Sequence, residues 1–234
     1  MKAVILAGGF GTRLSEETED KPKPMIEIGG KPILWHIMKG YSHYGINDFV
    51  ICCGYKSEII QNYVKTLNEK WNVNAVDTGL QTMTGGRLLQ VRRYVDDRTF
   101  CFTYGDTLND LKVDKLIQFH KKMKTYATVT ACHPPEKYGI LTIKDNNVTK
   151  FQEKPPKKDE WVNGGFFVLE PEIFDYIQND ETIWENYSMK KLVIDKQCSA
   201  YKHEGFYKPM DFISDKNYLQ KLWRAGKAPW KVWE

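Results

Sequence analysis

A turn rich in glycine and ending in arginine follows the first apolar run of the chain. Residues 8–13 read GGFGTR and come directly after the run AVILA at residues 3–7. Consecutive glycines let backbone amides approach an anion closely, and a guanidinium group suits phosphate oxygens. The spacing is that of neither a P-loop nor a dinucleotide fingerprint. We interpret the turn as a candidate polyphosphate site, with a tight strand-to-helix connection as the alternative.

Two lysines lie in a proline-rich stretch shortly after this turn. The sequence DKPKPM places Lys21 and Lys23 next to Pro22 and Pro24. Proline fixes its own φ angle and restricts the residue before it, so both lysines are held in a stiff segment. They could stabilise negative charge that develops on a phosphate, or they could form a solvated basic loop.

Two aspartates from distant segments are candidates for a metal site. Asp106 ends the apolar run TFCFTYGD, and Asp211 lies in the loop sequence KPMDF. Mg²⁺ prefers oxygen ligands and keeps waters and substrate phosphates around it. Each aspartate alone could equally cap a helix, so the prediction depends on the two side chains meeting.

An acidic and a basic residue stand together in the sequence FQEKPP. Glu153 could accept hydrogen bonds from hydroxyl groups of a substrate, and Lys154 could hold a monophosphate. Neighbours in a strand point to opposite faces, so both reach one ligand only if the strand ends or bends at the following prolines. The alternative is a surface pair on an edge strand.

Composition narrows the class of protein. The 234 residues carry 34 basic and 30 acidic side chains, a mild excess that lacks the concentrated stripe of a nucleic-acid binder. No apolar stretch is long enough to span a membrane. Five cysteines without CxxC spacing and five histidines without metal spacing predict reduced thiols in a cytoplasmic protein and no zinc site. The length suits a single domain over residues 1–234.

Alternating strands and helices are needed to position these residues. The predicted buried strands cover residues 3–9, 48–55, 99–106 and 126–134, and the predicted helices cover 31–46, 57–67 and 112–124. Ser57 would cap the second of these helices. The alternation indicates an α/β protein with a Rossmann-like, mostly parallel sheet flanked by helices. Ligands bind at the carboxyl ends of such strands, where residues 8–13 and Asp106 would converge.

The second half of the chain adds a small β-rich elaboration. Residues 138–155 predict a hairpin that turns at Asn146 and Asn147, and a strand followed by a helix from Pro171 is predicted next. A last helix would end near Gly226. The tryptophans Trp223, Trp230 and Trp233 would then anchor the C-terminal segment or an oligomer contact, and we expect a homo-oligomer.

Taken together, the motifs resemble one protein family almost end to end. That family is the sugar-phosphate nucleotidyltransferases, and the resemblance is greatest to its members that use CTP. The motifs that carry the resemblance are, in chain order, KAVILAGGFGTRL, KPKPMIEIGGKPILWHIM, FVICCGY, MTGGRL, FTYGD, FQEKP, NGGFFVL, PMD and GKAPWKVWE. It implies the nucleotidyltransferase fold and an enzyme that joins CTP to a phosphorylated acceptor with release of pyrophosphate. The implied cofactor is Mg²⁺, and the acceptor in the family is glucose 1-phosphate.

The resemblance also implies a role for each matching residue. Arg13 and Lys23 would be catalytic, and Asp106 and Asp211 would hold Mg²⁺. The nucleotide would contact Leu6, Ala7, Gly8, Gly9, Gly11, Thr12, Thr84, Gly85, Gly86 and Asp106, with the base next to Thr84, Gly85 and Gly86. The acceptor would contact Tyr138, Gly139, Glu153, Lys154, Asn163, Gly164 and Lys208, with its phosphate on Lys154. The expected partners are these two small molecules, with neither nucleic acid nor membrane.

Departures from the family pattern gather around the expected acceptor site. Ile140 stands where relatives carry alanine, Lys208 stands where they carry glutamine, and the segment at residues 64–70 is shorter. Added bulk and charge could favour a smaller or more acidic acceptor. Transfer from CTP to a non-sugar phosphate such as L-glutamine phosphate, in capsule modification, is therefore the alternative.

Two other classes are more remote. A non-catalytic nucleotide-sugar sensor would be expected to lose Lys23, Asp106 or Asp211, and all three are present. A nicotinamide-dependent oxidoreductase would need an acidic residue at the end of the next strand to bind the ribose, and FVICCGY ends without one.

Overall fold

Strands and helices alternate along most of the chain, as the sequence pattern predicts. The computed structural model describes residues 1–134, 140–144, 146–152 and 160–234. Its strands are β1 (Lys2–Ala7), β2 (Glu27–Ile28), β3 (Lys31–Pro32), β4 (Asp48–Cys53), β5 (Asn72–Asp77), β6 (Phe100–Tyr104), β7 (Thr107–Asn109), β8 (Ala127–Cys132), β9 (Ile140–Lys144), β10 (Asn147–Gln152), β11 (Val162–Leu169), β12 (Cys198–His203) and β13 (Tyr207–Pro209). Its α-helices are α1 (Ser15–Thr18), α2 (Ile33–His43), α3 (Ser57–Lys65), α4 (Thr84–Gln90), α5 (Val113–Met123), α6 (Met189–Ile194) and α7 (Ile213–Arg224).

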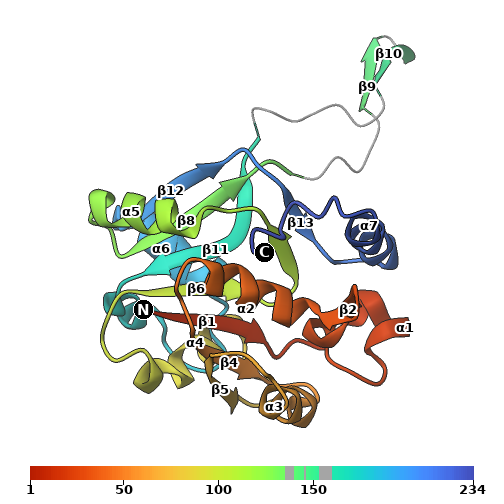
Figure 1. The fold of residues 1–234 in the computed structure, drawn as a ribbon. Coiled ribbons are helices and arrows are strands. Elements are labelled where there is room, and N and C mark those ends of the chain that lie inside the picture. The colour runs from red at the N-terminus through yellow and green to blue at the C-terminus, as the bar shows by residue number, and fades with distance from the viewer. Residues whose placement is uncertain (135–139, 145, 153–159) are drawn as a thin grey trace.

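A seven-stranded sheet with the order β12-β8-β11-β6-β1-β4-β5 lies at the centre of the fold (Figure 1). The strand β1 pairs in parallel with β4 on one side and with β6 on the other. Within this sheet β11 runs antiparallel to both of its neighbours, and the remaining pairs are parallel. The predicted mostly parallel α/β sheet flanked by helices is therefore confirmed.

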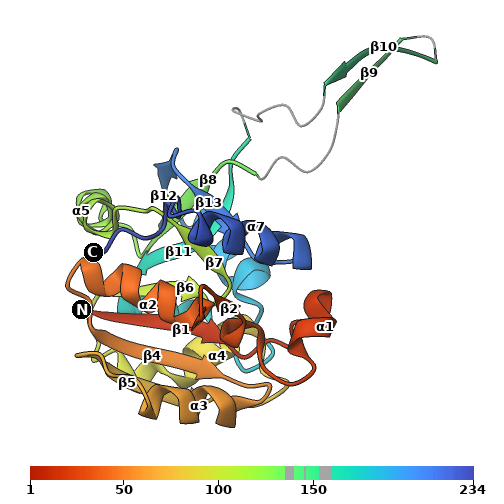
Figure 2. The same cartoon turned by 45° about the vertical axis from the view of Figure 1, so that its right-hand side comes forward.

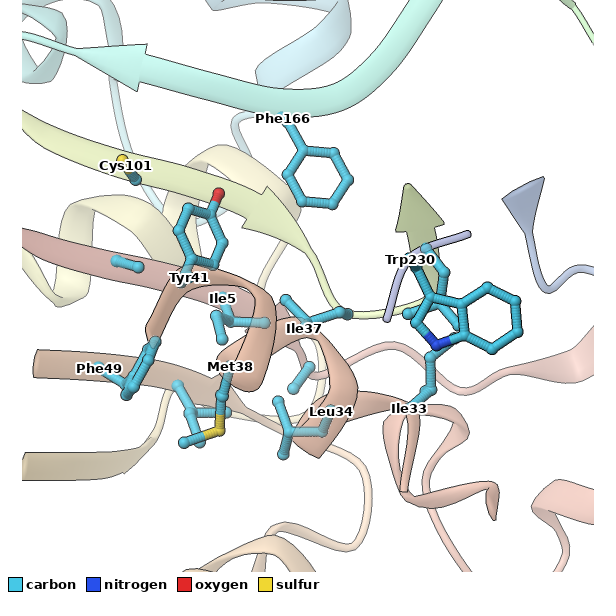
Figure 3. Close-up of a cluster of buried hydrophobic side chains, with 14 of the residues drawn as sticks. Ile5, Ile33, Leu34, Ile37, Met38, Tyr41, Phe49, Cys101, Phe166 and Trp230 are labelled. Carbon is cyan, nitrogen blue, oxygen red and sulfur yellow. The ribbon is translucent and has the colours of Figure 1, made fainter. Parts of the chain in front are cut away.

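The two faces of β1 contribute to two different hydrophobic layers. Ala3 and Ile5 face a layer that contains residues of α2, α3 and α5, whereas Val4 faces a layer with residues of α4 and α6. Figure 3 shows the first layer, where Met38 and Tyr41 of α2 lie close to Ile5. A strand that is buried on both faces needs apolar residues at every position, which explains why the first run of the chain is apolar without interruption.

The short strands β7 and β13 bring two distant segments together at the carboxyl end of β6. They pair antiparallel, with Pro209 opposite Thr107. The amide of Met210 donates to the carbonyl oxygen of Asp106 at 2.9 Å. This pairing places Asp211 beside Asp106. Figure 2 shows β1 pointing toward the end of the molecule at which α1 and α7 lie.

The C-terminal segment packs back onto α2. The last helix ends at Arg224, and Gly226 follows with a φ of +66°. Trp230 and Trp233 are buried and lie within 6.2 Å of the His36 ring, measured between ring centroids. The tryptophans thus anchor the C-terminal segment, one of the two roles that the sequence predicts for them.

Several local predictions need correction. Lys56 takes the N-cap position of α3 without a side-chain cap, so Ser57 is the first helical residue and does not cap the helix. The helix predicted from Pro171 is a 3-10 segment, Pro171–Tyr176. The predicted hairpin is present as β9 and β10, with Asn146 at a φ of +67° in the turn. None of the helices in the described part of the chain has both the length and the apolar character to cross a membrane.

Candidate active site

A cavity of about 500 Å³ lies at the carboxyl ends of β1 and β6. It is lined by Leu6, Ala7, Gly8, Gly9, Phe10, Gly11, Thr12, Arg13, Lys23, Pro24, Leu80, Gln81, Thr82, Met83, Thr84, Arg87, Tyr104, Gly105, Asp106 and Glu185. The position is the one at which parallel sheets bind ligands. The cavity brings together the glycine turn, one proline-flanked lysine and one of the two aspartates that the sequence singles out.

The glycine turn presents its backbone to this cavity. Gly11 has a φ of +68°, and a Cβ atom there would lie 2.9 Å from the Thr18 side chain. No hydrogen-bond acceptor within the described residues engages the amides of Gly9, Phe10 or Gly11. Three free amides in one turn, with glycine at the position of positive φ, can bind an anion.

Charged side chains from three segments meet at one edge of the cavity. The Lys23 Nζ atom lies 2.7 Å from Asp106 Oδ2 and 3.1 Å from Asp211 Oδ1, and Arg13 Nη1 lies 3.1 Å from the same Asp211 oxygen. Lys23 is 9% exposed, which is low for a lysine. We call Arg13, Lys23, Asp106 and Asp211 the Lys23 centre. The two aspartates, 105 residues apart in sequence, thus contact one ammonium group.

The donor set of this centre suits a hard cation. Both carboxylates reach one position, and Mg²⁺ takes few protein oxygens because it keeps water and phosphate oxygens as further ligands. Among the described residues no cluster of three or more histidine, cysteine, aspartate or glutamate side chains offers an all-protein metal site. The centre therefore fits a metal that arrives with a phosphate-bearing substrate.

The carboxylate of Glu185 also lines the cavity. Glu185 Oε2 accepts a hydrogen bond from the Thr84 hydroxyl at 2.8 Å, and Oε1 accepts one from the Tyr104 hydroxyl at 2.5 Å. Burial and the neighbouring Glu185 raise the pKa of Tyr104 far above its usual value, so this hydroxyl remains a donor. The Trp184 amide also donates to the Thr84 hydroxyl, at 2.9 Å.

The two glycines of MTGGRL do not line the cavity, although the resemblance places them next to the base. The amides of Gly85 and Gly86 donate to the carbonyl oxygen of Thr182 at 2.9 and 3.2 Å. A Cβ atom on Gly85 would lie 2.7 Å from that oxygen, and one on Gly86 would lie 2.4 Å from the Asp180 carbonyl oxygen. The glycines instead let α4 approach the segment that carries Glu185.

The residues expected around the acceptor are only partly described. Tyr138, Gly139, Glu153 and Lys154 lie outside the described residues. The Asn163 side chain donates to the Tyr104 hydroxyl at 3.0 Å, and a Cβ atom on Gly164 would lie 2.6 Å from Cys132 Sγ. Lys208 does not line the cavity. Its ammonium group lies 2.6 Å from Asp215.

The second lysine of the proline-rich stretch also lies elsewhere. Lys21 lines a shallow depression beside α7, together with Lys216 and Lys221. Of these two lysines Lys23 alone lines the cavity, together with Pro24 of the 3-10 segment Lys23–Met25. A role of either lysine at a phosphate stays a prediction.

Comparison with known proteins decides the family. A profile of the nucleotidyl transferase family matches residues 2–229. The chain belongs to this family. It is 51% identical, over 257 aligned positions, to glucose-1-phosphate cytidylyltransferase of Salmonella typhimurium, and 100% of each chain is covered. Since the alignment is longer than the 234 residues of this nucleotidyl transferase, the relative has residues that it lacks.

Solved structures share the fold of this nucleotidyl transferase. UDP-glucose pyrophosphorylase complexed with UDP-glucose matches with a TM-score of 0.75 at 17% identity, covering 96% of this chain and 98% of that chain. HddC from Yersinia pseudotuberculosis complexed with GMP-PN matches with a TM-score of 0.73 at 23% identity, covering 95% and 99%.

Sequence reasoning misses two charged residues that line the cavity of this nucleotidyl transferase, Glu185 and Arg87. Arg87 stands in the motif MTGGRL, where an arginine directly after two glycines is a usable signal. Glu185 has no local signal. It reaches the cavity only because α4 packs against the segment before it, through the hydrogen bonds of Gly85 and Thr84.

Proposed function

We propose that this nucleotidyl transferase is a Mg²⁺-dependent cytidylyltransferase. It joins CTP to a phosphorylated acceptor and releases pyrophosphate, and glucose 1-phosphate is the acceptor. The name of the 51% identical Salmonella relative supports CTP and this acceptor. The single observation that carries the reaction type is the meeting of Lys23, Asp106 and Asp211 beside the free amides of the glycine turn.

The proposed chemistry needs no covalent bond to the protein. An oxygen of the acceptor's phosphate forms a bond to the α-phosphorus of CTP. The bond from that phosphorus to the oxygen bridging it to the β-phosphorus breaks, and this oxygen leaves with the pyrophosphate. Lys23 and Arg13 would stabilise negative charge on the phosphate oxygens, and the amides of residues 9–11 would hold the triphosphate. Placement and charge stabilisation are then the main sources of rate enhancement.

Asp106 and Asp211 would hold Mg²⁺, and the metal would polarise phosphate oxygens as a Lewis acid. In the described structure the Lys23 ammonium contacts both carboxylates. An incoming triphosphate offers Lys23 another anion, which would leave these carboxylate oxygens available to a cation. The five free cysteines fit an enzyme of the cytoplasm, where thiols stay reduced.

Glu185 would contact the nucleotide or the acceptor through its remaining lone pairs. A carboxylate has about four acceptor sites, and Thr84 and Tyr104 use two of them. The 4-amino group of cytosine is a donor that could use another, whereas uracil has an acceptor at the same position. A contact between Glu185 and the base would therefore favour CTP over UTP.

Pyrophosphate release tests the proposal. The purified protein is mixed with Mg²⁺, one of CTP, UTP or dTTP, and either glucose 1-phosphate or L-glutamine phosphate. We expect release with CTP and glucose 1-phosphate. Release with UTP or dTTP but not CTP would overturn the choice of base. Release with L-glutamine phosphate alone would establish the alternative acceptor, and nucleotide binding without release from any pair would indicate a sensor.

A further inference from the structure

Arg87 is a buried cation beneath the glycine turn. Arg87 is 5% exposed, although it lines the cavity. Nη1 donates to the carbonyl oxygens of Cys53 and Gly79 at 2.9 and 2.7 Å and to the Thr78 hydroxyl at 2.7 Å. Nη2 donates to the carbonyl oxygens of Gly8 and Leu80 at 3.1 and 3.2 Å.

These contacts join the ends of three neighbouring strands. Gly8 follows β1, Cys53 ends β4, and the segment from Thr78 to Leu80 follows β5. Every acceptor is an uncharged oxygen, and no ion pair within the described part of the chain involves Arg87. A planar guanidinium can make such divergent contacts at once, whereas the ammonium group of lysine is a compact point charge.

The packing around the guanidinium leaves no room for side chains on two glycines. A Cβ atom on Gly8 would lie 2.2 Å from Arg87 Nη1, and one on Gly54 would lie 2.4 Å from the same atom. The Gly8 carbonyl oxygen is also held by the amide of Tyr55, at 3.2 Å. The guanidinium thus occupies a closed space formed by backbone, and it fixes the orientation of the Gly8 carbonyl group.

The orientation of this carbonyl determines that of the next amide. A trans peptide unit is planar, with its C=O and N–H bonds pointing in opposite directions. Since the Gly8 oxygen points to Arg87 and Tyr55, the Gly9 N–H bond points the opposite way. Gly9 lines the cavity, and its amide has no acceptor among the described residues.

We propose that Arg87 is a positioning residue for the nucleotide, which holds the Gly9 amide toward the triphosphate and fixes the segment from Thr78 to Leu80, of which Leu80 lines the cavity. The inference rests on the proposed function, because it assigns Arg87 to the same nucleotide site. Arg87 acts through the backbone, and its positive charge, which forms no ion pair within the described residues, adds to the attraction of the cavity for an anion.

This role differs from that of a residue that only stabilises the fold. A purely structural arginine would lower the melting temperature on substitution and would leave the affinity of the folded fraction unchanged. A positioning arginine changes nucleotide affinity in the folded protein and leaves acceptor affinity unchanged. The two roles are separated by measuring the KM for each substrate and the binding of tripolyphosphate, which has no base.

The test compares Arg87→Lys with Arg93→Lys. Arg93 is exposed, lies in the 3-10 segment Arg92–Tyr94 that follows α4, and does not line the cavity. Wild-type binding of CTP and tripolyphosphate is measured first by calorimetry, because its absence would count against the proposed function rather than against Arg87. For Arg87→Lys we expect the Kd for both ligands and the KM for CTP to rise about tenfold or more, since several charged hydrogen bonds are lost. The acceptor KM should stay within twofold, and Arg93→Lys should match the wild type.

A second variant keeps the arginine and moves it. In Gly54→Ala the new methyl group would lie 2.4 Å from Arg87 Nη1 and 2.7 Å from the Gly8 carbonyl oxygen. It would disturb both partners of the Arg87–Gly8 hydrogen bond, so tripolyphosphate should again bind several-fold more weakly. Millimolar ethylguanidinium should partly restore CTP binding to Arg87→Ala. Folded Arg87→Lys or Gly54→Ala protein with wild-type Kd values for both ligands would overturn the inference, as would an equal rise in both substrate KM values.

Discussion

The glycine turn after β1 and the Lys23 centre lie in one cavity but are held in place by different interactions. The turn is fixed by hydrogen bonds to its main chain, with the Gly8 carbonyl oxygen accepting from the Tyr55 amide and the Arg87 guanidinium group. The Lys23 centre is held by contacts between charged side chains of three distant segments. The first arrangement presents fixed amides, whereas the second contains charges that can exchange partners when a substrate or a cation arrives.

This difference indicates a division of labour. Fixed amides bind an anion without reorganisation and suit the parts of a substrate that do not change during the reaction. Exchangeable ion pairs suit the reacting centre, where charge develops. Changes in the Lys23 centre should therefore lower kcat most strongly, and changes that disturb the glycine turn should act mainly on nucleotide KM.

The largest effect is expected for Lys23→Ala. Loss of the ammonium removes charge stabilisation at the reacting phosphate and leaves two carboxylates facing each other, so kcat should fall by about 10² to 10³-fold. Steady-state pyrophosphate release measures the change, and circular dichroism checks the fold. Lys21→Ala is the matched control, since this lysine lies outside the cavity and should keep wild-type turnover. A folded Lys23→Ala enzyme with near-normal kcat would contradict the assignment of the Lys23 centre to the reacting phosphate.

Asp106→Asn and Asp211→Asn should have the next largest effect, about 10²-fold on turnover. The two variants should also need more Mg²⁺ for half-maximal rate, because each removes one charged oxygen from the proposed metal position. Rates over a Mg²⁺ titration give both quantities. Asp110→Asn is the control, because Asp110 pairs with His203 and does not line the cavity. An unchanged Mg²⁺ requirement in both variants would mean that Asp106 and Asp211 do not hold the metal.

The Lys23 centre shows what a sequence can predict and where such prediction ends. Lys23, Asp106 and Asp211 are recognisable because prolines brace the lysine and because one aspartate ends a buried strand. Their meeting depends on the pairing of β7 with β13, which joins residues about a hundred positions apart. The sequence around Glu185 does not predict it as a site residue, because its position depends on packing between α4 and a π-helical turn, Trp184–Ser188. The sequence also does not reveal that the amides of Gly85 and Gly86 bond to a carbonyl oxygen of the distant residue Thr182.

A buried group without charged partners should respond to pH differently from the Lys23 centre. His36 is 1% exposed, and burial lowers its pKa to about 4. The unfolded chain binds this proton near pH 6.5 and the folded protein only near pH 4, so stability is lost as the pH falls through that window. Between pH 7 and pH 5 we expect His36 to lower the free energy of unfolding by about 2 kcal/mol.

Urea unfolding at the two pH values measures this contribution as the difference between the wild type and His36→Gln. The exposed residue His43 provides the control variant, His43→Gln, for the loss of an imidazole outside the core. Parallel profiles for the wild type and His36→Gln would mean that the C-terminal tryptophans do not keep His36 neutral, and that the C-terminal segment opens more easily than its packing suggests.

The smallest effect is expected for Lys208→Met. This ammonium group contacts Asp215, whose second oxygen accepts from the amides of Asp211 and Phe212 at the start of α7. Loss of a partly buried ion pair should lower the free energy of unfolding by about 1 to 2 kcal/mol. Since the charge of Lys208 is balanced by Asp215, the KM for the acceptor should stay within twofold of the wild type. A large rise in acceptor KM, with unchanged stability, would instead move Lys208 into the acceptor site and extend the set of exchangeable charges from the Lys23 centre to β13.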